Sequence, residues 1–298
     1  MKLAEESKKI NNYGDEREMK SKIKNLAKGL MALTLIATMT PIAHTTVHAT
    51  PTQQEARAVF STGTVGPNGA PWVLYNDGVV EVESGFINWT NGARSPWDAH
   101  RNNIHKIVFN GPITAGESLS GLFTNLQNVT EIEGLHYFDT SMVQNMNHMF
   151  INTRSLVELD LSNWDTSNVL HMERMFFETG LSSLNLSNWD TSNVRGSMSW
   201  LFANARNLEV LNISNWDIGN TTNLLSMLQQ ATSLRQLTLG ENFTSTIPSF
   251  TRIALPEIVA NEVYTGRWQN VGAGTLNNPQ GEFVFTSTQL IAHYATNP

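Results

Sequence analysis

The chain has 298 residues, of which 40% are hydrophobic and 15% charged, and its formal net charge is −7; this composition excludes a disordered chain. The lack of cysteine excludes disulfides, thiolate zinc sites and cysteine nucleophiles. Residues 1–49 hold 8 of the 19 Lys and Arg and 5 of the 26 Asp and Glu, which leaves 11 basic and 21 acidic residues, with Lys106 the one lysine among them. We therefore expect no nucleic-acid partner, since that binding needs clusters of Lys and Arg.

The N-terminus has the order of segments found in a secretory signal peptide. Lysines at 20, 22, 24 and 28 precede an apolar stretch over 29–43, and small residues follow at Val47 and Ala49. The apolar stretch is too short for a membrane-spanning helix, so we predict a signal peptide over 1–49 and no membrane-spanning segment in the mature chain. An uncleaved anchor or a core helix is the alternative. Acidic residues before Met19 are unusual for a signal peptide, so either Met1 or Met19 is the start.

Residues 50–110 are interpreted as an N-terminal β cap. Alternating apolar residues over 72–82 surround Asn76-Asp77-Gly78, which is a strong hairpin signal. Trp97 and a strand-like run over 104–109 follow.

The middle of the chain is a repeat. The segment "LVELDLSNWDTSNVLHMERMF" at 156–176 recurs as "LSSLNLSNWDTSNVRGSMSWLF" at 181–202, and worn copies lie on both sides. The apolar residues that close the units are separated by 27, 26, 26 and 26 positions, and they are Phe123, Phe150, Phe176, Phe202 and Leu228. A period this steady indicates a solenoid, because stacked copies bury a core that one copy cannot.

Each unit divides into two halves. Leu156, Leu159 and Leu161 have the spacing L-x-x-L-x-L of a short strand. "SNWDTSN" then supplies turn and capping residues, of which Asp165, Thr166 or Ser167 is expected to cap a helix. The apolar residues after the cap fall at i, i+3, i+6 and i+7, one helical face, and they are Val169, Met172, Met175 and Phe176.

The repeat "LxLSNWDTSNVxxMxxMF" resembles that of the BspA-type leucine-rich-repeat surface proteins of bacteria, and the likeness extends upstream to "PWVLYNDGVVEVESG" and downstream to "YTGRWQNVGAGTLNNPQGEF". We therefore predict an α/β fold, a leucine-rich-repeat solenoid over 111–255. It has about five units of ~26 residues, with a short strand and a short helix in each. A small C-terminal β module or junction is predicted over 256–298. The LPxTG, lipobox and WxL anchors of such surface proteins are not visible in the chain.

Outward residues on the strands vary between units while the inward leucines do not, which is typical of a binding surface on a constant scaffold. An ordinary solvated face would look the same. The candidate ligand-binding residues are Val157, Glu158, Asp160, Ser183, Asn185, Glu209, Asn212, Gln236 and Thr238.

No catalytic, cofactor-binding or metal-binding residue is predicted, because no HExxH, G-x-S-x-G elbow or phosphate loop occurs. The ladder of Trp164, Trp189 and Trp216 could stack on sugars, but repeated aromatics at repeat spacing favour core packing. One Asp per unit, as at Asp165 and Asp190, gives too few oxygens for calcium and favours capping.

These observations favour a secreted or cell-surface, non-enzymatic, adhesin-like protein. The resemblance implies a host extracellular protein, mucin or glycan as partner, or another bacterial surface component. The alternative is a cell-wall-associated scaffold that binds wall glycan or another surface protein.

Export gives the first testable prediction. The mature protein should begin near Thr50 and accumulate outside the cytoplasm, because a signal peptidase cleaves after small residues such as Ala49. N-terminal sequencing of protein from the culture medium measures this. An intact leader on cytosolic protein would contradict it.

Overall fold

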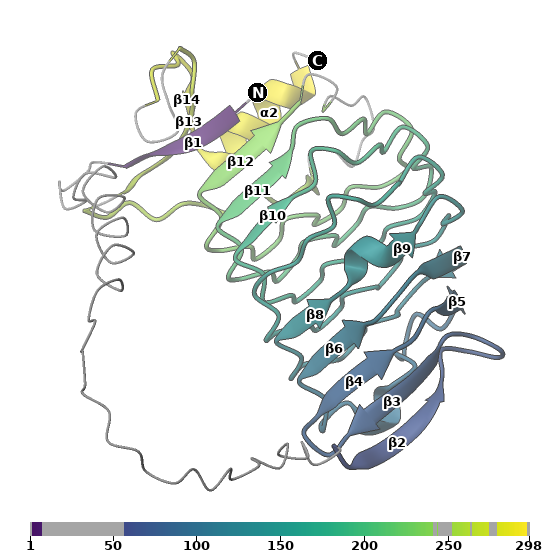
Figure 1. Ribbon diagram of the computed structural model, residues 1–298. Coiled ribbons are helices and arrows are strands. Elements are labelled where there is room, and N and C mark those ends of the chain that lie inside the picture. Colours follow the sequence, from purple (N-terminus) through teal and green to yellow (C-terminus); the bar gives the residue numbers. More distant parts are fainter. Residues whose placement is uncertain are drawn as a thin grey trace, which may run out of the picture. The chain divides into compact units, whose positions relative to one another are not determined.

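The computed structural model describes residues 2–7, 57–240, 243, 252–262, 264–273 and 279–296. Apart from residues 2–7, the predicted signal peptide lies outside the described residues. From residue 79 to residue 239 the chain winds into a stack of coils, each of which contributes one segment to the same face (Figure 1). This is a repeat solenoid with a leucine-rich-repeat-like pattern, as predicted, and it has about six turns rather than five units.

The strands form three sheets. The first has the order β2-β3-β4-β6-β8, the second β5-β7-β9, and the third β10-β11-β12-β1-β13-β14. The bounds are β1 Lys2–Ser7, β2 Val59–Thr64, β3 Pro71–Tyr75, β4 Val79–Val82, β5 Gly85–Trp89, β6 Lys106–Phe109, β7 Ile113–Leu119, β8 Glu131–Glu133, β9 Phe138–Asp139, β10 Ser183–Asn185, β11 Val210–Ile213, β12 Gln236–Leu239, β13 Tyr264–Asn270 and β14 Val284–Phe285. Two 3₁₀ turns, η1 (Asp98–His100) and η2 (Leu135–Tyr137), and one helix, α2 (Ser287–Thr296), complete the described elements.

The leucine positions of successive coils lie side by side. Val80 pairs with Ile107 and Ile107 with Ile132 in parallel register, and further along Leu184 pairs with Leu211 and Leu211 with Leu237. Most of the inward side chains are buried, and Ile132 and Leu159 are partly buried. The core therefore runs the length of the stack, and each coil covers the apolar face of its neighbour.

The predicted helix in each unit is wrong. An α-helix pairs every amide with the carbonyl four residues back, but here alternate amides donate to the neighbouring coil. The N–H of Phe150 donates to the C=O of Met175 (N···O 2.8 Å), and that of Phe176 to Leu201 (2.9 Å). An intervening amide, that of Met175 next to Phe176, stays within its own coil and donates to the C=O of Met172, three residues back (3.4 Å). The second half of the coil is therefore a run of turns, and turns of this period also bring Met and Phe inward at the spacing that a helix would give.

Left-handed backbone conformations make these turns possible. In three successive coils, two residues have φ between 54° and 62°. The first position is occupied by His148, Arg174 and Trp200, and the second, four residues later, by Asn152, Glu178 and Asn204. Residues other than glycine pay about 1–3 kcal/mol for this region. The conformations persist because both neighbours along the stack fix the backbone by hydrogen bonds.

The tryptophans of "SNWDTSN" pack in the core, as predicted. Trp164, Trp189 and Trp216 are buried, Trp189 with 1% of its surface exposed. Each indole N–H donates to a carbonyl of the previous coil, Trp164 to Leu135 (3.1 Å), Trp189 to Leu161 (3.3 Å) and Trp216 to Leu186 (3.1 Å). Beside them, Phe123, Phe150, Phe176 and Phe202 form a stack with ring centroids 5.2–5.6 Å apart.

The polar residues of the motif also bind neighbouring coils. The Thr166 hydroxyl donates to the Asp190 carbonyl (3.0 Å), and that of Thr191 to the Asp217 carbonyl (2.7 Å). The amide of Asn193 donates to the Ser167 carbonyl of the previous coil (2.6 Å). Almost every residue of the motif therefore has a partner one coil away.

Asp165 was predicted to cap a helix, but in the structure it stabilises a turn. Its Oδ1 accepts hydrogen bonds from the N–H (2.9 Å) and the hydroxyl (2.6 Å) of Ser167, an Asx turn. The Ser167 hydroxyl, and then its amide, lower the pKa of Asp165 below the usual value.

The two ends of the stack differ. The predicted N-terminal hairpin is present, with β3 and β4 antiparallel and Gly78 at φ 79° in the turn. At the C-terminus β13 and β14 pair antiparallel, and α2 follows them, which the prediction of a β module did not include. Within the described residues no helix has the length and apolar content needed to cross a membrane.

The core role of the tryptophans predicts a large loss of stability for Trp189→Ala. The substitution leaves a cavity between Phe176 and Trp216, whose rings lie 6.4 Å from that of Trp189, and should lower the free energy of unfolding by about 3–5 kcal/mol. Denaturant titration measures this loss. The control is Ser183→Ala on the outer face, which should lower the free energy of unfolding by less than about 0.5 kcal/mol. Equal stability of the two variants would contradict the core role.

The Asx turn predicts that Asp165→Ala costs about 1 kcal/mol, while Asp165→Asn keeps the accepting oxygen and costs less. Because the folded pKa of Asp165 is depressed, its contribution is present above the unfolded pKa of about 3.9 and is lost as pH falls through the folded value. Thermal melts at pH 7 and through the acid range should therefore show a smaller acid loss for Asp165→Asn than for the parent. An acid loss equal to that of the parent would argue against this role.

Candidate functional site

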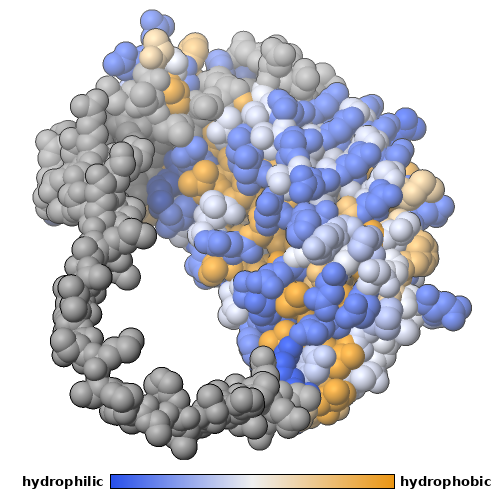
Figure 2. Space-filling model, in the orientation of Figure 1, coloured by the Kyte–Doolittle hydropathy of each residue, from blue (hydrophilic) through white to orange (hydrophobic). Residues whose placement is uncertain are grey.

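A groove of about 790 Å³ crosses the sheet face between β8 and β10. Three successive coils line it, with the residues Thr130, Glu131, Ile132, Glu133, Val157, Glu158, Leu159, Asp160, Ser162, Ser183 and Asn185. The described surface of the molecule mixes hydrophilic and hydrophobic residues (Figure 2). The volume is within the range of about 300–1,000 Å³ that is usual for ligand sites.

Five of the nine predicted contact residues lie together in this groove. Val157, Glu158, Asp160, Ser183 and Asn185 are all exposed, as expected for strand residues between inward leucines. Val157 is notable because it is apolar and 50% exposed.

The other four predicted residues lie outside the groove. Glu209 forms an ion pair with Arg235, and Asn212 and Gln236 are half-buried. Thr238 is buried, with 4% exposed, so its expected outward accessibility is wrong. The physical reason is that the array ends at β12, where β1 pairs alongside and places Lys2 opposite Thr238.

The groove also contains residues that the sequence analysis did not assign to a surface. Glu131 and Glu133 lie on β8, where Ile132 occupies the position of the repeat leucines. The spacing of Val129 and Ile132 matches the first part of L-x-x-L-x-L, and this signal would have placed both glutamates on the outer face.

One ion-pair cluster lies at the edge of the groove. The ammonium of Lys106 on β6 contacts Glu131 (2.9 Å) and Glu133 (2.8 Å). The hydrogen bonds that Lys106 donates, first to Glu133 and then to Glu131, raise the pKa of Lys106, and the bond from Lys106 lowers the pKa of Glu131. The pairs are exposed, so each contributes little to stability, but they commit the single lysine of this region to two carboxylates.

Asp160, Asn185 and Asn212 also have a local structural role. Each accepts a hydrogen bond from the amide two residues on, Asp160 from Ser162 (2.9 Å) and the two asparagines from their serines (3.2 Å). In these three coils the position therefore holds residues that form Asx turns. What changes between these coils is the charge, from Asp to Asn.

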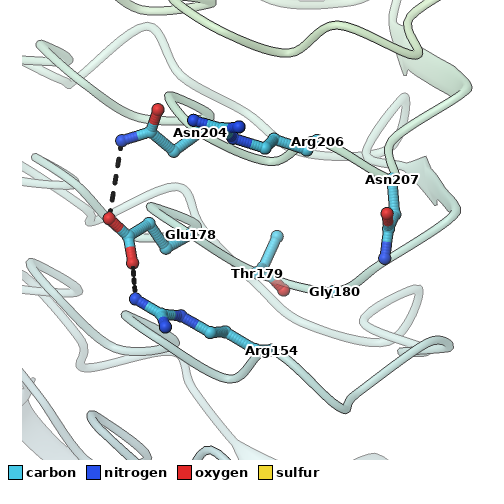
Figure 3. A pocket seen from close by; sticks show the side chains of 7 residues that line it. All are labelled: Arg154, Glu178, Thr179, Gly180, Asn204, Arg206 and Asn207. Atoms are coloured by element: carbon cyan, nitrogen blue, oxygen red, sulfur yellow. Dashed lines mark hydrogen bonds and ion pairs between the residues drawn. The ribbon is translucent and has the colours of Figure 1, made fainter.

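A second, smaller pocket of about 420 Å³ lies where the turns lead back into the strand half of the coil. Figure 3 shows Glu178 between Arg154 and Asn204, which come from the coils on either side, with Arg206 and Asn207 also lining the pocket. Glu178 pairs with Arg154 and accepts a hydrogen bond from Asn204 (3.5 Å). These groups already satisfy one another, so the pocket is a weaker candidate than the groove.

The part of the chain that the structure describes contains no cluster of side chains suited to bind a metal ion. No three His, Asp or Glu side chains there are grouped closely enough to hold an ion. The aspartates of the repeat, which could have formed a calcium ladder, instead accept hydrogen bonds within their own turns.

Residues 117–243 match the family described as "Mycoplasma protein of unknown function, DUF285". Comparison with curated proteins gives no match. Among solved structures, a leucine-rich repeat protein from Eubacterium ventriosum is similar at 13% identity, with a TM-score of 0.20, over 68% of this chain and 91% of that one. The DUF285 match covers the coils that carry the "SNWDTSN" motif and the groove.

Proposed function

We propose that this chain is a secreted or cell-surface, non-enzymatic interaction protein, adhesin-like, which binds a protein or glycan ligand through the sheet face of its solenoid. The observation that carries the proposal is the groove between β8 and β10. Five of the variable outward residues line it together, and one of them, Val157, exposes an apolar side chain.

The construction of the coils supports a binding role. The inward and turn residues are committed to the core and to coil-to-coil hydrogen bonds, so the outer strand positions can vary at little cost in stability. Loops and faces held by a rigid scaffold are where binding residues concentrate, and solenoids generally bind along such extended faces.

Export and the surface location rest on the sequence. The predicted leader over 1–49 supports export, and the resemblance to BspA-type surface proteins supports attachment to a host matrix protein, mucin or glycan. The second candidate, a scaffold that binds wall glycan or another surface protein, uses the same groove and differs only in its ligand.

A binding panel separates the two candidates. Immobilised full-length chain is exposed to extracellular matrix proteins, mucin, soluble peptidoglycan fragments and a cell-surface protein extract, and bound material is measured by biolayer interferometry. We expect saturable binding to a matrix protein or mucin. Binding confined to peptidoglycan or to the surface extract would favour the scaffold, and turnover of any of these by pure protein would contradict a non-enzymatic role.

Blocking the groove tests where the ligand binds. Ser183→Trp places a bulky side chain in the groove, and Thr114→Trp is the matched control at an exposed position of β7. The groove variant should bind at least about tenfold more weakly, with melting temperatures alike for both. Equal binding by the two variants would show that the ligand contacts another surface.

A further inference from the structure

The sheet is interrupted within the groove. β8 ends the first sheet and β10 begins the third, and the coil between them passes through 157–161 without forming a strand. No backbone hydrogen bond joins this segment to β8 among the described residues, and one joins it to the next coil, from the Ser182 N–H to the Val157 carbonyl (3.2 Å). This part of the stack therefore presents unpaired backbone groups.

Those groups include four consecutive amides. The N–H groups of residues 157–160 donate no hydrogen bond to protein atoms in the described structure. Unpaired N–H and C=O groups at the edge of a sheet are a template for an added strand. Successive N–H groups of an extended segment point to opposite sides, so alternate ones of these four can face one such strand. Extended peptides use edges of this kind, with alternate side chains supplying specificity.

Carboxylates surround these free amides. Glu131 and Glu133 lie on one coil, and Glu158 and Asp160 on the next. Like charges side by side in a sheet are destabilising, and Lys106 offsets only part of this because it contacts the first pair. The next coil carries the uncharged Ser183 and Asn185 at these positions, and the outward Glu81 and Glu209 elsewhere on the sheet face form ion pairs with Arg57 and Arg235. The run of four carboxylates therefore ends at the groove.

The carboxylates are too dispersed to share one metal ion, which favours a ligand whose positive charges are themselves spread out. Residues two apart on a strand point to the same face about 6.6 Å apart, so Glu131 and Glu133 on β8 match a Lys-x-Lys spacing. Exposed Val157, with Ile132 and Leu159 in the same groove, provides apolar contact for the residues between.

We propose that the groove binds an extended polypeptide segment with Lys or Arg at alternate positions, whose backbone pairs with residues 157–160 and whose cations contact the four carboxylates. This inference rests on the proposed function and names its ligand class. It excludes a glycan as the principal ligand of the groove.

Fluorescein-labelled seven-residue peptides test the proposal with the full-length chain. The probe alternates Lys and Val, and binding is followed by fluorescence anisotropy. We expect saturable binding that weakens as salt rises. A peptide of the same composition with its lysines in one block should bind several-fold more weakly, and so should an alternating peptide with N-methylated backbone amides. Equal binding by all three would overturn the strand-pairing part, and no binding by the alternating peptide would overturn the proposal.

The matched variants neutralise charge without changing the turn. Glu158→Gln with Asp160→Asn reproduces the neutral character of the next coil and keeps the oxygen that accepts the Ser162 amide. This double variant should bind the alternating peptide about tenfold more weakly and melt no lower than the parent, because repulsion is removed. Glu117→Gln, at an exposed position of β7, should leave binding unchanged. If the groove and control variants lost peptide affinity equally, the effect would come from the net charge of the protein, and the proposed site would be overturned.

The proposed function and this inference fail separately. If the chain binds a matrix protein or mucin, if Ser183→Trp weakens that binding, and if the alternating peptide does not bind, the proposed function stays in place and the cationic segment is refuted. Peptide binding that the double variant abolishes would support both.

Discussion

The hydrogen bonds between coils are the constraint on which the rest of this structure depends. Because alternate amides of the turn half donate to the neighbouring coil, each coil needs another on either side. The motif "SNWDTSN" extends the same arrangement to side chains through its Trp, Thr and Asn. A chain without disulfides gains its stability from this repetition rather than from a single compact core.

Much of the fold could be predicted from the sequence, because repetition makes the inward positions visible. The period, the inward leucines and the packing of the tryptophans all follow from spacing and residue size. The turns could not be predicted in this way. Apolar residues at i, i+3 and i+7 satisfy a helix and this run of turns equally, and the difference lies in the positive φ of residues such as Arg174 and Glu178, which have no intrinsic preference for it.

The candidate site was predictable in part for the same reason. Alternation along a strand identified Val157, Glu158 and Asp160 as outward residues, but it could not reveal that the sheet is interrupted beside them. That interruption is a property of two coils together, since it lies between β8 and the segment 157–161 of the next coil. Thr238 was mispredicted for a related reason. Its position in the repeat is outward, but the pairing of β12 with β1 buries it.

The groove is where the coils depart most from the strand pairing that joins their neighbours. Elsewhere the coils pair strand to strand, and here free amides and unbalanced carboxylates remain at the surface. Local departures of this kind from a repeating pattern are expected at functional sites.

The coil-by-coil construction also has a mechanical consequence. If the two ends of the stack are pulled apart, every interface between coils carries the same load, and the weakest one breaks first. When an interface breaks, a coil of about 26 residues extends by roughly 90 Å at 3.3–3.6 Å per residue. The remaining coils keep their hydrogen bonds while this happens. The solenoid would thus lengthen in equal steps and dissipate energy at each one, instead of failing in a single event.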